Sequence, residues 1–223
     1  MKRHAPPIAA VLAATAMLLM AACGGGGDGE SASSDNDKVT GADAKSKPSA
    51  SPTVSATAST TSAARPTIDL PSDVRHTFTP EKTGDAVKDA VLKDNAETIR
   101  ALDAAIVAQN PRLPALEYYT EGEGAAAAEN WVKAFTDAGW TVTGSVNYVD
   151  REVNVSNSTS ASLSYVGDEG KGFARVIKTG EVRKTPDSKD SYVAYAVQVR
   201  KNNAGVWELV KITSIRGADR CQP

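Results

Sequence analysis

The stretch GAAAAENWVKAFTDAGWTVTGSVNYV, residues 124–149, contains the change of hydrophobic period that decides the fold. In its first part, Trp131, Val132 and Phe135 are spaced as on one face of a helix, and we expect that face to be buried. Gly139 follows the last helical turn, where glycine readily adopts the left-handed conformation that ends a helix. Beyond it, apolar residues alternate with polar ones, as in a strand with one buried face. The stretch therefore predicts a helix that runs directly into a strand.

Upstream, residues 79–111 carry a longer helical pattern. Thr79 precedes Pro80, which is typical of a helix N-terminus, and the pattern ends near Pro111. The apolar residues that share its buried face are Leu92, Ala96, Ile99, Leu102 and Ile106. A short helix or turn is expected at LPALEYYTEG, residues 113–122.

The chain after Gly139 has the period of strands. The expected strands are residues 140–149, 151–157, 160–166, 172–184, 191–201 and 206–215. Turn residues lie between them, for example GDEGKG at residues 167–172. Helices followed by a run of strands predict an α+β fold, with the N-terminal helices packed on one face of an antiparallel sheet.

The N-terminus is typical of a secretory signal. A short basic start precedes residues 8–22, which carry no charge and are fewer than the about 20 apolar residues that span a bilayer. The run ends in Met20, Ala21, Ala22 and Cys23, which resembles the bacterial lipobox with Met20 in place of the usual leucine. The resemblance implies removal of residues 1–22 and a diacylglyceryl group on Cys23, and two acyl chains anchor a protein stably. An uncleaved helix, or cleavage without lipid, is the alternative.

Residues 23–77 are rich in Gly, Ser, Thr, Ala and Pro and contain no Trp, Tyr or Phe. Such a segment buries too little apolar surface to offset its chain entropy, so we expect a disordered tether. All Trp, Tyr and Phe residues lie in residues 78–223, which we expect to form one domain. The formal net charge is −2 and no basic cluster is visible, which argues against nucleic acid as a partner.

A further pattern concerns the order of motifs in residues 83–221. A helix is followed by LPALEYYTEG, a helix ending in AGW, strands that close with GVWELVKI, and a cysteine near the end. This order resembles a family of actinobacterial secreted proteins and lipoproteins in the nuclear transport factor two-like superfamily. The resemblance implies a cone-like fold, with helices across a curved sheet. Members are mostly of unknown function, so the resemblance implies a fold rather than an activity.

In that family a cysteine on a strand pairs with the terminal cysteine. Here Tyr165 stands in its place, so the resemblance implies that Cys221 has no partner in the domain. Cys221 is then a bystander at a frayed C-terminus, or a reactive or intermolecular thiol.

The sequence also excludes several chemistries. Both histidines, His4 and His76, fall outside residues 78–223. The expected domain therefore lacks a histidine general base, a serine–histidine pair and a histidine zinc ligand. We expect no metal and no cofactor, and we expect the domain not to be an enzyme.

Tyrosines and carboxylates remain as candidates for chemistry in a cavity. The residues that we expect to line such a cavity are Tyr118, Tyr119, Trp131, Tyr148 and Tyr195. The superfamily that the chain resembles includes isomerases and dehydratases, for which Asp150 or Glu117 would supply the carboxylate. The structural alternative is a tyrosine with a buried ring and a hydroxyl in water.

These expectations combine into a membrane-anchored extracytoplasmic lipoprotein that presents a non-catalytic binding domain. Its partners would be the membrane, through the lipid on Cys23, and an envelope protein or a small apolar ligand. An isomerase- or dehydratase-like enzyme and a structural cell-envelope protein are the alternatives. A deep cavity lined by an ionisable pair would favour the enzyme, and an exposed apolar patch on a filled cone would favour a protein partner.

Overall fold

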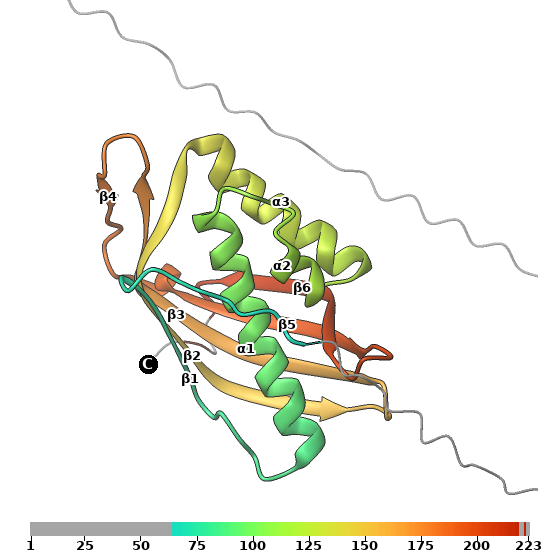
Figure 1. Ribbon diagram of the computed structural model, residues 1–223. Coiled ribbons are helices and arrows are strands. Elements are labelled where there is room, and N and C mark those ends of the chain that lie inside the picture. Colours follow the sequence, from blue (N-terminus) through green and yellow to red (C-terminus); the bar gives the residue numbers. More distant parts are fainter. Residues whose placement is uncertain (1–63, 219–220, 222–223) are drawn as a thin grey trace, which may run out of the picture. The chain divides into compact units, whose positions relative to one another are not determined.

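The structure is a computed structural model that describes residues 64–218 and residue 221. These residues belong to one compact unit (Figure 1). The predicted signal peptide, the tether up to residue 63, and the lipobox residues Met20, Ala21, Ala22 and Cys23 lie outside the described residues. Among the helices of the described part, none is long and apolar enough to cross a membrane.

The longest helix, α1, spans Ala86–Val107. Asp85 caps it, because its side chain accepts hydrogen bonds from two backbone N–H groups of the first turn. The predicted start at Thr79 is therefore wrong. The backbone N–H of Thr79 instead donates to the carbonyl oxygen of Tyr148 at 2.8 Å, which continues the pairing of the preceding strand. The end of the helix agrees with the prediction.

Two further helices confirm the sequence pattern. Helix α2 spans Pro114–Tyr118 and α3 spans Gly122–Ala138. Gly139 ends α3 in the left-handed conformation, with a φ of 68°. The chain then enters a strand at the next residue, as the change of hydrophobic period predicts.

The strands form one sheet in the order β1–β2–β3–β5–β6, and β4 pairs with β3 beside this path. They span Val74–Phe78 (β1), Trp140–Val155 (β2), Ser160–Val176 (β3), Val182–Arg183 (β4), Tyr192–Lys201 (β5) and Trp207–Arg216 (β6). β1 is parallel to β2, and the other pairs are antiparallel.

Strands β2 and β3 are each continuous across a predicted break. In β2 the break becomes a shift of register after Val149, where Asp150 has a φ of 52°. In β3 the predicted turn at residues 167–172 is wrong, because Gly167, Asp168, Lys171 and Gly172 pair with β2 and residues 169–170 lie at a shift of register within the strand. Their glycines serve packing instead: a Cβ at Gly172 would lie 2.7 Å from the side chain of Val146.

The packed domain begins earlier than predicted. All of strand β1 except Phe78 falls in the predicted tether, yet the strand pairs with β2 along its whole length. Before it, Ile68 packs against the helices, and Arg65 forms an ion pair with Asp94 on α1. The predicted boundary between residues 77 and 78 is therefore wrong. A segment without Trp, Tyr or Phe can still be fixed by a short strand and a buried ion pair.

The helices cover one face of the curved sheet (Figure 1). One buried cluster, which includes Leu92, Leu163 and Trp207, lies between α1 and the sheet. A second, which includes Ile106 and Val132, joins the three helices. The predicted α+β fold, with helices on a curved and mostly antiparallel sheet, is confirmed.

Cys221 packs against the sheet in a third cluster with Val166 and Ala194. It is 7% exposed and forms no disulfide within the described chain. The expectation of a frayed position is wrong, because the thiol lies against β3 and β5.

Candidate ligand-binding cavity

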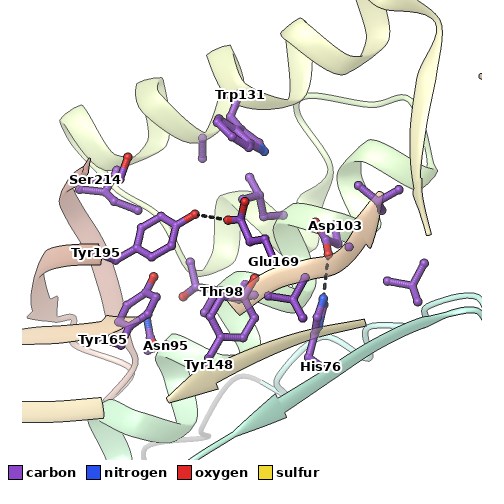
Figure 2. A pocket seen from close by; sticks show the side chains of 18 of the residues that line it. His76, Asn95, Thr98, Asp103, Trp131, Tyr148, Tyr165, Glu169, Tyr195 and Ser214 are labelled. Atoms are coloured by element: carbon purple, nitrogen blue, oxygen red, sulfur yellow. Dashed lines mark hydrogen bonds and ion pairs between the residues drawn. The ribbon is translucent and has the colours of Figure 1, made fainter. Parts of the chain in front are cut away.

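A cavity of about 410 Å³ lies between α1, α3 and the sheet. Side chains from β1, β2, β3, β5 and β6 form the wall opposite the helices. The wall is mostly apolar, and a few polar groups face inward (Figure 2). Its volume falls in the range of small-molecule sites, which share this combination of apolar walls and few polar groups.

Three tyrosines on neighbouring strands form one wall of the cavity: Tyr148 on β2, Tyr165 on β3 and Tyr195 on β5. Tyr165 is directly opposite Tyr195 in the strand pairing, and their rings stack at 5.0 Å between centroids. Tyr148 meets Tyr165 edge to face at 5.9 Å. A Cβ at Gly167 would lie 3.1 Å from the Tyr195 ring. Because Gly167 has no side chain, the rings of Tyr148 and Tyr195 can occupy the space beside it.

Glu169 on β3 projects into the cavity toward the hydroxyl of Tyr195 (Figure 2). It accepts a hydrogen bond of 2.7 Å from the Tyr195 hydroxyl and another of 2.7 Å from the Arg216 guanidinium. Burial, followed by the negative charge of Glu169, raises the pKa of Tyr195 above its usual value. The hydroxyl therefore stays protonated and donates to the carboxylate.

His76 on β1 and Asp103 on α1 form a second polar pair in the cavity wall. The Nε2 atom lies 2.8 Å from a carboxylate oxygen of Asp103, and the two side chains are 2% and 17% exposed. The Nδ1 atom of His76 is enclosed without a hydrogen-bond partner. The expectation that both histidines lie outside the domain is therefore wrong for His76, because β1 is part of the sheet. His4 lies outside the described residues.

Tyr148 is the cavity tyrosine nearest to this second pair, and its ring lies 5.8 Å from the ring of His76. Burial raises the pKa of the Tyr148 hydroxyl well above its usual value, and the negative charge of Asp103 raises it further. Tyr148 is therefore neutral at physiological pH. A neutral hydroxyl can donate or accept a hydrogen bond from a bound molecule.

The structure places three of the predicted lining residues in the cavity wall: Trp131, Tyr148 and Tyr195. Trp131 lies at the rim and is 47% exposed, so its expected burial is wrong. Tyr118 and Tyr119 are not in the wall. Tyr119 is buried among the helices, and the ring of Tyr118 meets it edge to face.

The predicted carboxylates lie elsewhere. Glu117 pairs with Arg112 on the surface, and Asp150 is exposed at the register shift of β2. The carboxylates of the cavity are Asp103 and Glu169, which sequence reasoning missed. Asp103 stands beside the predicted apolar face of α1, and a charged residue on such a face is a usable signal. Glu169 had no signal, because its stretch has the composition of a turn.

No cluster of three or more His, Cys, Asp or Glu residues in the described part of the chain could hold a metal ion. The polar groups of the cavity instead form the two separate pairs described above. They can orient a ligand by hydrogen bonds, and their carboxylates can accept a proton.

No family model and no curated protein matches this chain. Solved structures to which it is similar include the intermembrane space region of chloroplast protein ARC6, with 11% identity over 60% of this chain and 99% of that chain and a TM-score of 0.39. They also include a ketosteroid isomerase-like protein from Erwinia carotovora atroseptica, with 13% identity over 59% of this chain and 97% of that chain and a TM-score of 0.40.

Proposed function

We propose that this chain is a lipid-anchored extracytoplasmic protein whose domain binds a small, largely apolar molecule in the cavity. The observation that supports binding is the open cavity of about 410 Å³ between the helices and the sheet. Protein interiors are normally close-packed, and an unfilled apolar space costs free energy. A bound molecule that fills this space would recover the lost contacts.

The lining groups define the kind of molecule. Apolar side chains such as Ile99, Phe173 and Ile212 favour a ring or a short hydrocarbon body. The inward-facing polar groups occupy only a few points of the wall, so they would fix the orientation of a ligand that carries one or two oxygen atoms. Trp131 and Arg216 lie where the cavity meets solvent and would contact the ligand as it enters.

The proposed anchor rests on the lipobox-like residues that end in Cys23 and on the composition of the tether. A diacylated cysteine would hold the protein at the outer surface of the cytoplasmic membrane. A polar tether would then let the domain move in the space beyond the bilayer. The cavity would sample small molecules there.

Proton-transfer catalysis is a second candidate function. The observation that favours it is that Asp103 and Glu169 face the same apolar cavity as the neutral hydroxyl of Tyr148. A carboxylate can take a proton from a carbon beside a carbonyl while a hydroxyl donates a hydrogen bond to the carbonyl oxygen. His76 would act as a positioning residue, because it holds Asp103 by a hydrogen bond.

Ligand binding can be tested with two substitutions on strand β6. Ile212 lines the cavity, whereas Ile215 is 65% exposed. Ile212→Trp should fill the cavity and weaken binding of a neutral ring compound, 4-nitroanisole, by tenfold or more, on the order of 1.4 kcal/mol. Ile215→Trp makes the same chemical change outside the cavity and should leave the affinity unchanged. Calorimetric titration of the unlipidated mature chain, residues 23–223 with Cys23→Ser, avoids detergent.

Equal affinity in the two variants would count against binding in the cavity. The catalytic candidate has a separate test. If it holds, the protein exchanges the acidic C–H protons of a bound cyclic ketone for deuterium, and Asp103→Asn or Glu169→Gln slows this exchange without abolishing binding. Exchange at the rate of buffer alone would exclude that candidate.

A further inference from the structure

The end of β3, the turn after it and β4 form a hairpin, residues 171–184, in which positive charge is concentrated. It contains five basic residues and one acidic residue, a formal net charge of +4 in a chain whose total is −2. The basic residues are Lys171, Arg175, Lys178, Arg183 and Lys184. They are spread along the sequence, and the pairing of β3 with β4 brings them together, because Arg183 lies opposite Ala174, next to Arg175. The fold therefore creates a basic surface that the linear sequence does not show.

Most of this charge has no carboxylate beside it. Arg175 is the exception, because its guanidinium lies 2.8 Å from a carboxylate oxygen of Asp73. The other four basic side chains of the hairpin form no ion pair with any described residue. Positive charges that are grouped on one surface and left unpaired attract anionic partners.

Apolar side chains stand among these charges. Ile177 is 50% exposed and Val182 is 37% exposed, so the hairpin carries two of the five large apolar side chains that the described part of the chain exposes. At the base of the hairpin, the guanidinium of Arg183 lies over the Trp140 ring, 4.6 Å from the ring centroid. Figure 1 shows the hairpin standing out beyond the end of the sheet. It can therefore present cations and apolar groups together to a surface.

A lipid bilayer with anionic headgroups fits this combination of side chains. Lys and Arg are attracted to anionic headgroups, and apolar side chains gain free energy at the boundary of the acyl chains. Trp is enriched at the same boundary, since its ring is apolar and its N–H remains hydrogen-bonded. A soluble polyanion would meet the positive charges alone and would leave Ile177 and Val182 in water. The exposed apolar groups thus favour a lipid surface.

Strand β3 connects the hairpin to the cavity. Phe173 and Ala174 line the cavity, and the hairpin turn follows them directly along the chain. The backbone N–H of Ile177 donates to the carbonyl oxygen of Gly139 at 3.0 Å, which ties the turn to the end of α3. A bilayer in contact with the hairpin would therefore lie near the cavity. Apolar molecules dissolve in bilayers, so this contact would bring the cavity close to their source.

We propose that the hairpin of residues 171–184 is a docking surface for an anionic lipid bilayer. Its lysines and arginines contact the headgroups, and Ile177 and Val182 enter the boundary of the acyl chains. The inference goes beyond the proposed binding function, because it assigns a surface outside the cavity. It also does not depend on a lipid at Cys23, so it can be tested on a chain that carries none.

The test is sedimentation of the unlipidated mature chain, carrying Cys23→Ser, with two kinds of vesicle. One kind contains phosphatidylglycerol and phosphatidylcholine in equal amounts, and the other contains phosphatidylcholine alone. The protein should bind the anionic vesicles, and less tightly as the salt concentration rises. Lys178→Gln combined with Lys184→Gln should weaken this binding on the order of tenfold or more. No binding of the wild-type chain to anionic vesicles would overturn the inference.

Two matched controls separate docking by the hairpin from general attraction. Lys82→Gln combined with Lys93→Gln removes two exposed lysines at the start of α1 and should leave binding nearly unchanged. Ile177→Ser should weaken binding by about fivefold, whereas Ile215→Ser, at another exposed position, should have no effect. Equal losses in the two lysine pairs would refute a specific surface. Full binding by Ile177→Ser, together with equal binding to soluble polyphosphate, would show a site for polyanions and refute the lipid surface.

The same chain also distinguishes this inference from the proposed binding function. Titration with 4-nitroanisole reports on the cavity, and the hairpin variants should leave that affinity unchanged. A chain that binds 4-nitroanisole and no vesicle would keep the cavity function and lose the docking surface. A chain that binds anionic vesicles through the hairpin and no ring compound would do the reverse.

Discussion

At the scale of single residues, the most enclosed charge in the described chain is Asp94 on α1, which is 0% exposed. Its carboxylate pairs with the guanidinium of Arg65 and accepts a hydrogen bond of 2.9 Å from the backbone N–H of Trp207. Removing one partner of a buried ion pair leaves an uncompensated charge in a low dielectric. Arg65 therefore makes the segment before β1 a structural part of the domain.

This pair leads to a first prediction. Arg65→Met should lower the free energy of unfolding by about 2 kcal/mol, less than for a fully buried pair because Arg65 is 34% exposed. Arg112→Met breaks an exposed pair with Glu117 and should leave the free energy of unfolding nearly unchanged. Urea denaturation of both variants measures the difference. Equal losses of unfolding free energy in the two variants would mean that Arg65 does not stabilise the buried carboxylate of Asp94.

The cavity tyrosines lead to a second prediction, on alkaline pH. The pKa of Tyr165 is raised to about 12, and those of Tyr148 and Tyr195 are also raised, by burial first. The folded state therefore holds these protons more tightly than the unfolded chain, in which tyrosine ionises near about 10. Their contribution to stability is complete below about pH 10 and is lost as the pH rises through about 12.

Ultraviolet absorbance should show these tyrosines ionising together with the loss of the circular dichroism of the fold. Tyr165→Phe should reduce the slope of stability against pH above about pH 10. Ionisation of all six tyrosines near pH 10 with the fold intact would contradict this account.

Single residues of the site were the hardest part to predict. Tyr148 and Tyr195 follow from the period of their strands, since alternate residues share a face. His76 could not be placed, because nothing in its composition distinguishes a short edge strand from the tether before it. Asp103 on α1 and Glu169 on β3 face the same cavity because a space remains between the helix and the sheet. That space depends on how the whole fold packs, so the local sequence around either residue does not reveal it.

At the scale of elements, the start of α3 lies unusually close to β6. The backbone N–H of Glu121 donates to the carbonyl oxygen of Leu209 at 2.9 Å, and a bridge joins Thr120 to the same residue. Gly124 lies at the contact, where a Cβ would be 2.2 Å from the Leu209 oxygen. The absence of a side chain therefore allows the helix to rest against the backbone of the strand.

A third prediction follows from this contact. Glycine to alanine inside a helix normally stabilises it by up to about 1 kcal/mol. Gly124→Ala should instead destabilise the domain by about 1–3 kcal/mol, because α3 must move away from β6. Asn130→Ala, at an exposed position of the same helix, should be neutral or slightly stabilising. Thermal unfolding distinguishes the two, and a stabilised Gly124→Ala variant would show that the contact is not tight.

For most segments the sequence predicts correctly whether they form a helix or a strand. It predicts less well the residues at which these elements begin and end. The end of α3 is fixed by local chemistry, since Gly139 adopts a conformation that other residues avoid. The sequence predicts the start of α1 at Thr79, but tertiary pairing of Thr79 with Tyr148 holds that residue beside the sheet, and the helix begins after Asp85. The glycines of residues 167–172 suggest a turn, but Gly167 and Gly172 leave space for side chains of the neighbouring strands.

At the scale of the whole molecule, the proposed anchor leads to a fourth prediction. Protein extracted in detergent from its own membranes should begin at Cys23 and carry at least two acyl chains on that residue. Cys23→Ala should block lipid transfer and leave an N-terminus that is not acylated. Intact-mass spectrometry measures both. A wild-type protein with Met1 retained, or with a free Cys23 thiol, would exclude the proposed anchor.

The proposed function requires that the cavity between α1, α3 and the sheet holds a small ring compound. The most direct measurement is a crystal structure of the unlipidated mature chain soaked with 4-nitroanisole. We expect density for the compound in contact with Ile212 and the Tyr195 ring, on the inner side of Trp131 at the rim. A cavity filled by the protein's own side chains, or the compound bound only on the outer face of the sheet, would contradict it.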